Sequence, residues 1–122
     1  IDSQVILFEI DADLISSSIG LKKSDYSQIN RFPSSERDVS LIFDKSITSA
    51  DIINMISLHK LVETVIPVDV YAGEEIKQEK KSVTYRIIYR ADDKTLTGEQ
   101  VQKAQNSILK NLKEELGVVS RF

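Results

Sequence analysis

The stretch KKSVTYRIIYR occupies residues 80–90, and its apolar and polar side chains alternate. Val83, Tyr85, Ile87 and Tyr89 fall on one side of an extended chain, while serine, threonine and arginine fall mostly on the other. Alternation with a period of two is typical of a strand with one buried face. The sequence therefore predicts a long strand here, with one side packed on a core and the other facing away from it.

A helix is expected on each side of this strand. Thr48 with Asp51, and Thr97 with Gln100, have the spacing of capping boxes, in which two side chains bond the backbone at a helix start. The first helix should run to about Val62. The apolar positions that predict the buried sides of the two helices are Ile52, Ile53, Ile56 and Leu61, then Val101, Ala104, Ile108, Leu112 and Leu116. Gly117 is placed to stop the second helix.

Three further strands complete the pattern. Residues 38–43 alternate, with Val39, Leu41 and Phe43 on one side. Pro67 interrupts an apolar run that continues through Tyr71 to Gly73, which predicts a strand at a sheet edge. Residues 118–122 are expected to form a last short strand.

The predicted order is strand, helix, strand, strand, helix, strand. This is the α+β, ferredoxin-like βαββαβ arrangement, a four-stranded antiparallel sheet with both helices on one face. The other face is left open to solvent or to a partner.

The first 29 residues have a different character. Residues 4–10 are apolar and short enough for one strand, residues 11–15 suggest a helical turn, and residues 16–24 have the composition of a linker. A lone strand is not stable, so its partner is expected in a preceding domain or at an edge of the following one. We therefore divide the chain into residues 1–29, a strand and linker from a preceding domain, and residues 30–122, one domain. With no initiator methionine, the chain is read as a piece of a longer protein.

Composition excludes several classes of site. The 122 residues carry 16 basic and 19 acidic side chains, a net charge of −3, which argues against indiscriminate nucleic-acid binding. There is no cysteine and only one histidine, His59, so the sequence offers neither a zinc site nor a catalytic constellation. His59 is interpreted as a surface or helix-end residue. No run is apolar enough to span a membrane, and no cofactor is expected to bind these residues.

An ordered set of short motifs resembles one known family. Residues 32–38, FPSSERD, fit an aromatic-Pro-x-x-x-Arg-Asp motif that opens the ferredoxin-fold anticodon-binding domain of bacterial phenylalanyl-tRNA synthetase β subunits. The further matches, in chain order, are Asp69-Val70-Tyr71 with Gly73, Lys81-Ser82, Arg86 to Arg90, Leu96-Thr97, Gly117 and Arg121. The resemblance covers about residues 30–122, and residues 4–14 resemble the strand that closes the preceding domain of that subunit.

The resemblance implies a non-catalytic module that binds the anticodon stem-loop of a tRNA. The parent enzyme would be a cytoplasmic α2β2 ligase that attaches phenylalanine to its tRNA with ATP and magnesium. Its chemistry would lie in the α subunit, with no ATP or magnesium bound by this chain.

The residues themselves make RNA binding plausible. Strand parity places hydroxyl, arginine and tyrosine side chains on the open face, and single-stranded RNA is recognised by such combinations of aromatic faces and polar edges. Val68 and Val70 are expected to face the helices as core. The candidate RNA-binding residues are Tyr71, Ser82, Arg121, Arg86, Arg90, Lys81 and Arg37.

Each candidate also has a structural reading. Tyr71 could finish an edge strand with its ring over the hairpin, and Arg86, Arg90 and Arg121 could pair with carboxylates such as Asp38. Pairing or turn capping is the favoured role for Arg37. Two other functions stay open: a regulatory domain that binds a small molecule such as an amino acid, and a domain that only docks subunits.

Overall fold

The strand predicted first lies inside the sheet. The structure is a computed structural model that describes residues 5–20, 29–71, 76 and 78–121. Strand β3 (Lys80–Tyr89) lies between β2 (Val62–Tyr71) and β1 (Ser35–Asp44), and β4 (Val119–Ser120) pairs with the far side of β1. All the pairings are antiparallel, so the predicted four-stranded sheet of the ferredoxin-like α+β fold is confirmed.

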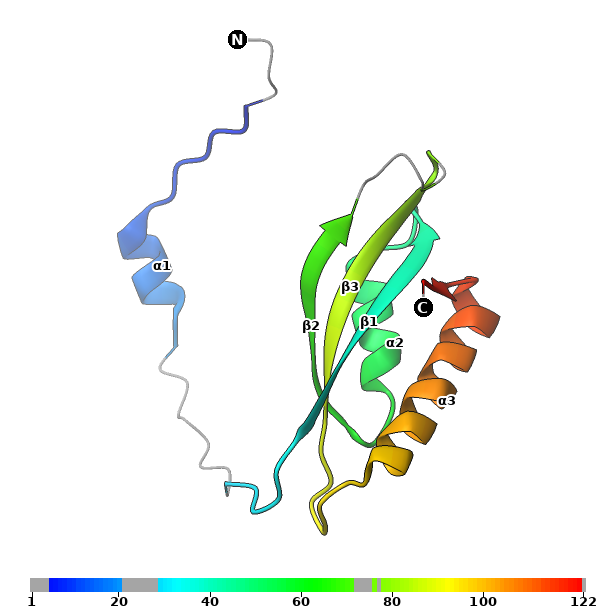
Figure 1. Cartoon of the computed structure of the whole chain (residues 1–122). Helices are drawn as coiled ribbons and strands as arrows, with labels where there is room; N and C mark the ends of the chain where they lie inside the picture. Colours follow the sequence, from blue (N-terminus) through cyan, green and yellow to red (C-terminus); the bar gives the residue numbers. More distant parts are fainter. Residues whose placement is uncertain (1–4, 21–28, 72–75, 77, 122) are drawn as a thin grey trace.

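Two helices cover one face of this sheet (Figure 1). Helix α2 (Ser49–Ser57) follows β1, and α3 (Gly98–Leu116) follows β3. Both predicted capping boxes are present, with Thr48 and Thr97 as the N-cap residues. Gly117 ends α3 with a φ of 63°, a left-handed conformation in which a glycine meets no Cβ penalty.

The core lies between the helices and the sheet. Its members have at most 9% of their surface exposed, and they include every residue predicted inward on the first and third strands. They are Val39, Leu41, Phe43, Ile52, Ile56, Val83, Tyr85, Ile87, Tyr89, Ala91, Leu96, Val101, Ala104, Ile108, Leu112 and Val118. Tyr85 donates to or accepts from the hydroxyl of Ser49 at 2.7 Å, which joins β3 to the first turn of α2.

The prediction that the first helix runs to Val62 was wrong. Helix α2 ends at Ser57, and the imidazole Nδ1 of His59 accepts the N–H of Leu61 at 3.3 Å in the turn that leads to β2. Leu61 nevertheless packs against the core from this turn, so its helical spacing gave no sign that the helix had ended.

Two residues predicted as core are exposed. Strand β2 is the sheet edge that Pro67 indicated, but Val68 and Val70 are 49% and 65% exposed. Val70 does lie opposite Val83 on the helix side of the sheet. The nine residues of α2 extend about 14 Å, whereas the ten residues of β2 extend about 33 Å, so α2 is too short to cover the whole edge strand.

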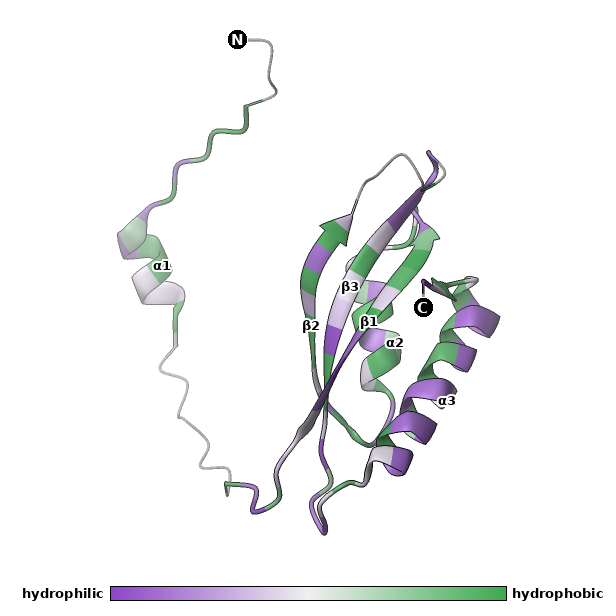
Figure 2. Ribbon diagram, in the orientation of Figure 1, coloured by the Kyte–Doolittle hydropathy of each residue, from purple (hydrophilic) through white to green (hydrophobic). Residues whose placement is uncertain are grey.

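The predicted strand at residues 4–10 is absent from the described part of the segment, residues 5–10, which has no regular structure. Helix α1 (Ala12–Ser18) follows, with the Asp11 carboxylate accepting the N–H groups of Asp13 and Leu14. The large apolar side chains at residues 5–8 and 10 are exposed, and Figure 2 shows the apolar character of this segment in green. No strand among the described residues pairs with it, which explains why the apolar run stays irregular. The boundary at residue 30 stays a prediction.

Candidate nucleic-acid interface

The helix-free face of the sheet brings together side chains from all four strands. Antiparallel pairing places Tyr71 of β2 opposite Ser82 of β3, and Ser82 opposite Ile42 of β1. The neighbouring row contains Asp69, Thr84 and Ser40, and it ends at Arg121, whose N–H bonds the carbonyl of Ser40 at 2.9 Å. We call these residues, from Tyr71 and Asp69 across to Arg121, the Tyr71 face.

An aromatic–guanidinium contact spans this face. The guanidinium carbon of Arg121 lies 5.0 Å from the centroid of the Tyr71 ring, within the range of a cation–π interaction. Tyr71 is 41% exposed, so this contact leaves part of the ring open to solvent. Of the seven residues predicted from the sequence, Tyr71, Ser82 and Arg121 are the three that the structure brings together here.

Ser82 differs from its expected exposure. It lies on the helix-free face, as predicted, but it is only 2% exposed. Its direct neighbours there are Tyr71 on one side and Ile42 on the other. A serine flanked by two larger side chains is screened from solvent even without a helix above it.

The central strands of the Tyr71 face carry polar side chains that already form a hydrogen bond. The hydroxyls of Ser40 and Thr84 lie 2.8 Å apart and bond each other between β1 and β3. Hydroxyls can both donate and accept, so this pair could exchange its mutual bond for one to the edge of a base.

Arg86 lies on the same face but is held by carboxylates. Its Nε and Nη2 donate to the two carboxylate oxygens of Asp38 at 2.8 and 3.0 Å, and Glu36 lies 4.0 Å away. The Arg86 guanidinium lowers the pKa of the Asp38 carboxyl. The structural reading of Arg86, pairing with Asp38, is therefore confirmed.

Two candidates lie on the other side of the sheet. Lys81 pairs with Phe43, and its ammonium stands 5.2 Å from the centroid of that core ring. Arg37 pairs with Ile87 on the helix side, and its Nη1 donates to the Glu36 carbonyl at 2.8 Å. Neither residue shares a face with Tyr71.

Lys80 belongs to the same basic stretch as Lys81 and is not among the seven candidates, yet it lies on the face of Tyr71. It lies opposite Asp44 and two residues from Ser82 on the same face of β3. Lys80 contributes to lowering the pKa of the Asp44 carboxyl, after the hydrogen bonds from Ser46. The alternation that placed Ser82 outward also places Lys80 outward and Lys81 inward, so the signal was present in the sequence.

Arg90 lies at the opposite end of the sheet. Eight residues of extended chain separate it from Ser82, about 27 Å. Its Nε lies 3.2 Å from a carboxylate oxygen of Glu63. Arg90 follows the last residue of β3 and lies apart from the Tyr71 face, and its role in RNA binding stays a prediction.

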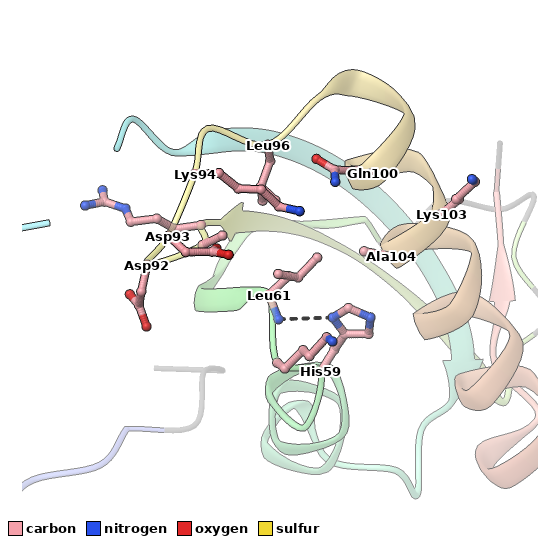
Figure 3. Close-up of a pocket in the computed structure, with 12 residues that line it drawn as sticks. His59, Leu61, Asp92, Asp93, Lys94, Leu96, Gln100, Lys103 and Ala104 are labelled. Atoms are coloured by element: carbon pink, nitrogen blue, oxygen red, sulfur yellow. Dashed lines mark hydrogen bonds between the residues drawn. The ribbon is translucent and has the colours of Figure 1, made fainter. Parts of the chain in front are cut away.

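Arg90 instead lines a cavity of about 560 Å³ between the turn after α2, the loop after β3 and the start of α3 (Figure 3). Leu61, Ala91, Leu96 and Ala104 supply its apolar lining. His59 also lines it, and burial, with a smaller effect of Lys60, lowers the pKa of its imidazole. Lysines and aspartates surround the opening, as Lys94, Lys103, Asp92 and Asp93 in Figure 3 show.

Neither a metal site nor a membrane span was found among the described residues. They hold no group of three or more His, Asp or Glu side chains arranged to bind a metal ion. None of the helices in the same part of the chain is long and apolar enough to cross a bilayer.

Comparison with known proteins identifies the family. The family model described as "Ferredoxin-fold anticodon binding domain" matches residues 30–121. The chain belongs to this family. The resemblance drawn from the sequence motifs is therefore confirmed.

Three curated relatives of this anticodon-binding domain share one name. The chain is 37% identical over 121 residues to the phenylalanine–tRNA ligase β subunit of Dehalococcoides mccartyi strain 195, and 35% identical over 123 residues to that of Clostridium acetobutylicum. It is 37% identical over 123 residues to the β subunit of Syntrophotalea carbinolica. Each alignment covers 99% of this chain but 15% of the relative, so the chain spans about one seventh of those proteins.

Proposed function

We propose that this chain binds the anticodon stem-loop of a tRNA through the Tyr71 face. The observation that carries the proposal is the cluster of Tyr71, Ser82 and Arg121 on the side of the sheet that no helix covers. An exposed aromatic ring can stack an unpaired base, and the hydroxyls beside it can bond the edge of that base. A guanidinium adds a partner for phosphate or base.

The names of the relatives extend the proposal to a parent protein. As part of a phenylalanine–tRNA ligase β subunit, the domain would hold the anticodon end of the tRNA in a cytoplasmic assembly with α subunits. ATP and magnesium would serve the parent's chemistry. No chemical step is assigned to this chain.

Electrostatics set the strength of the interaction. On the helix-free face Arg86 pairs with Asp38, and Lys80 lies opposite Asp44. Few cations are thus available for phosphate, and the isolated chain should bind weakly. Two phosphate contacts would make the logarithm of the association constant fall with the logarithm of salt concentration with a slope of about −1.4.

Chemical-shift mapping tests the proposal. An anticodon stem-loop of a phenylalanine tRNA is added to the isotope-labelled chain at low salt, and backbone and tyrosine-ring signals are followed. Shifts should concentrate on Tyr71, Ser82, Thr84 and Arg121 and should diminish as salt is added. Shifts confined to α2 and α3, or none at millimolar RNA, would remove the basis of the proposal.

The cavity near His59 supports a second candidate function. It lies at a helix–strand interface and has a partly apolar lining, which suits a small ligand such as an amino acid. Calorimetric titration with the twenty amino acids tests this function. Saturable heat that is abolished by Ala104→Trp would favour a regulatory module, whereas no heat would leave the RNA-binding proposal as the better one.

A further inference from the structure

Arg121 reaches Tyr71 from the far side of the sheet. Arg121 follows β4, and Tyr71 ends β2, so β1 and β3 lie between them. Three strand spacings amount to about 14 Å, yet the guanidinium stands 5.0 Å from the ring centroid. Both side chains must therefore lean inward over the two central strands.

The strands underneath are correspondingly covered. Ser82 sits on β3 directly beside Tyr71 and is 2% exposed, although it lies on the helix-free face. The hydroxyls of Ser40 and Thr84, in the adjacent row, bond each other at 2.8 Å. In this state, the polar groups suited to reading a base are screened or satisfied by the protein itself.

We infer that Arg121 is a displaceable cap: its guanidinium occupies the Tyr71 ring in the free protein and gives way to a base when RNA binds. The inference rests on the proposed function and assigns Arg121 two successive partners, first the tyrosine ring and then the RNA. Displacement of the guanidinium frees the face of the ring for stacking. An arginine suits both partners, because its planar cation stacks on aromatic rings and bonds phosphate.

The relative strengths of the two contacts favour displacement of the guanidinium by a base. A cation–π contact at an exposed site shifts an equilibrium by about two- to fivefold, whereas stacking a base on an aromatic side chain shifts it by about five- to 150-fold. A base therefore outcompetes the guanidinium for the ring. A solute that cannot stack on the ring does not displace the guanidinium, so the cap selects for unpaired bases.

The first test follows the Arg121 side chain by NMR. In the free wild-type chain, the ring current of Tyr71 shifts the δ-methylene and Nε–H signals of Arg121, and Tyr71→Leu abolishes that shift. Saturation with the anticodon stem-loop should move the wild-type Arg121 signals away from their ring-shifted positions as the base takes the ring. Arg86, on the same face but paired with Asp38, is the internal control and should not respond to Tyr71→Leu.

The outcomes separate this inference from the proposed function. If Tyr71→Leu leaves RNA affinity unchanged, the proposed function fails and the cap has no purpose. If Tyr71→Leu weakens RNA binding but Arg121 keeps its ring-current shift in the complex, the function stands and the cap is refuted. Absence of a ring-current shift in the free chain refutes the cap as well.

A second measurement uses chemical accessibility without RNA. Tetranitromethane nitrates exposed tyrosine rings, and mass spectrometry of the peptide that contains Tyr71 reports its rate. Arg121→Ala should raise the rate about two- to fivefold, the size of the lost cation–π contact. Arg86→Ala, which removes a guanidinium from the same face without uncovering Tyr71, should leave it unchanged. Equal rates in all three proteins would overturn the inference.

Discussion

The two faces of the sheet are built from the same strands but differ in what their side chains contact. On the helix-covered face, Tyr85, Ile87 and Tyr89 of β3 are at most 1% exposed and form the core. On the helix-free face of that strand, Thr84 bonds the hydroxyl of Ser40 and Arg86 bonds the carboxylate of Asp38. Because successive side chains of a strand point to opposite faces, one strand contributes both to the core and to the proposed binding face, and the two faces can be altered separately.

Adjacent isoleucines of β3 give the largest expected contrast. Ile87 is 1% exposed in the core, and Ile88 is half-buried on the helix-free face. Ile87→Ala should lower the free energy of unfolding by about 2–5 kcal/mol, because it removes buried methyl groups and leaves a cavity. Ile88→Ala should lower it by about 1 kcal/mol, since less area is lost from burial. Urea unfolding measures both, and equal losses would contradict the division between the faces.

Two core tyrosines on the helix-covered face differ in the hydrogen bonding of their hydroxyls. The Tyr85 hydroxyl bonds Ser49 at 2.7 Å, whereas the buried Tyr89 hydroxyl finds no hydrogen-bond partner among the described residues. Tyr85→Phe should therefore lower the free energy of unfolding by about 1 kcal/mol, and Tyr89→Phe should raise it by about 1 kcal/mol. Thermal and urea unfolding of the two variants should move in opposite directions. A loss of stability in Tyr89→Phe would show that its hydroxyl is satisfied.

Alkaline pH tests the same tyrosine. Burial raises the pKa of Tyr89 from 10.0 to about 12, with a smaller opposing effect from Arg37. The folded pKa lies above the unfolded one, so this contribution to stability is complete below pH 10 and is lost as pH rises towards 12. Wild type should lose stability across that window more steeply than Tyr89→Phe, as followed by circular dichroism in urea. Equal losses of stability in the two proteins would mean that the Tyr89 hydroxyl ionises as readily in the folded chain as in the unfolded chain.

The smallest effect is expected on the open face, at Asp38. Its hydrogen bonds from Arg86 lower its pKa below 3.8 in the folded chain. A depressed carboxyl pKa stabilises the fold above the unfolded value and loses that contribution as pH falls through the folded value. Asp38→Asn should thus be slightly less stable than wild type at pH 6 and equal to it near pH 2. A difference that persists near pH 2 would assign Asp38 a role other than this exposed ion pair.

Local patterns predicted much of the fold. The alternation of β3, the capping boxes at Thr48 and Thr97, the edge position implied by Pro67 and the stop at Gly117 each depend on neighbouring residues alone. The predicted burial was wrong where it depends on the length of one element relative to that of another. Val70 was assigned the correct face, but its exposure depends on how far α2 extends beside β2.

The candidate site was predicted only in part, because some of its contacts join elements that are far apart in the sequence. Parity within strands placed Tyr71 and Ser82 on the helix-free face, but the contact between Tyr71 and Arg121 depends on the register of four strands across 50 residues of chain. No sequence pattern specifies that contact. The choice of Lys81 over Lys80 was avoidable, because parity alone distinguishes the two faces.

The affinity of the Tyr71→Leu variant for the anticodon stem-loop tests the central claim most directly. Loss of base stacking should weaken binding about five- to 150-fold at constant salt, with the free energy of unfolding lowered by no more than about 1 kcal/mol through the lost cation–π contact. Val70→Ala, a change at an exposed neighbour on the helix side, should leave affinity unaltered. If Tyr71→Leu binds within twofold of wild type, the helix-free face is not where this domain reads RNA.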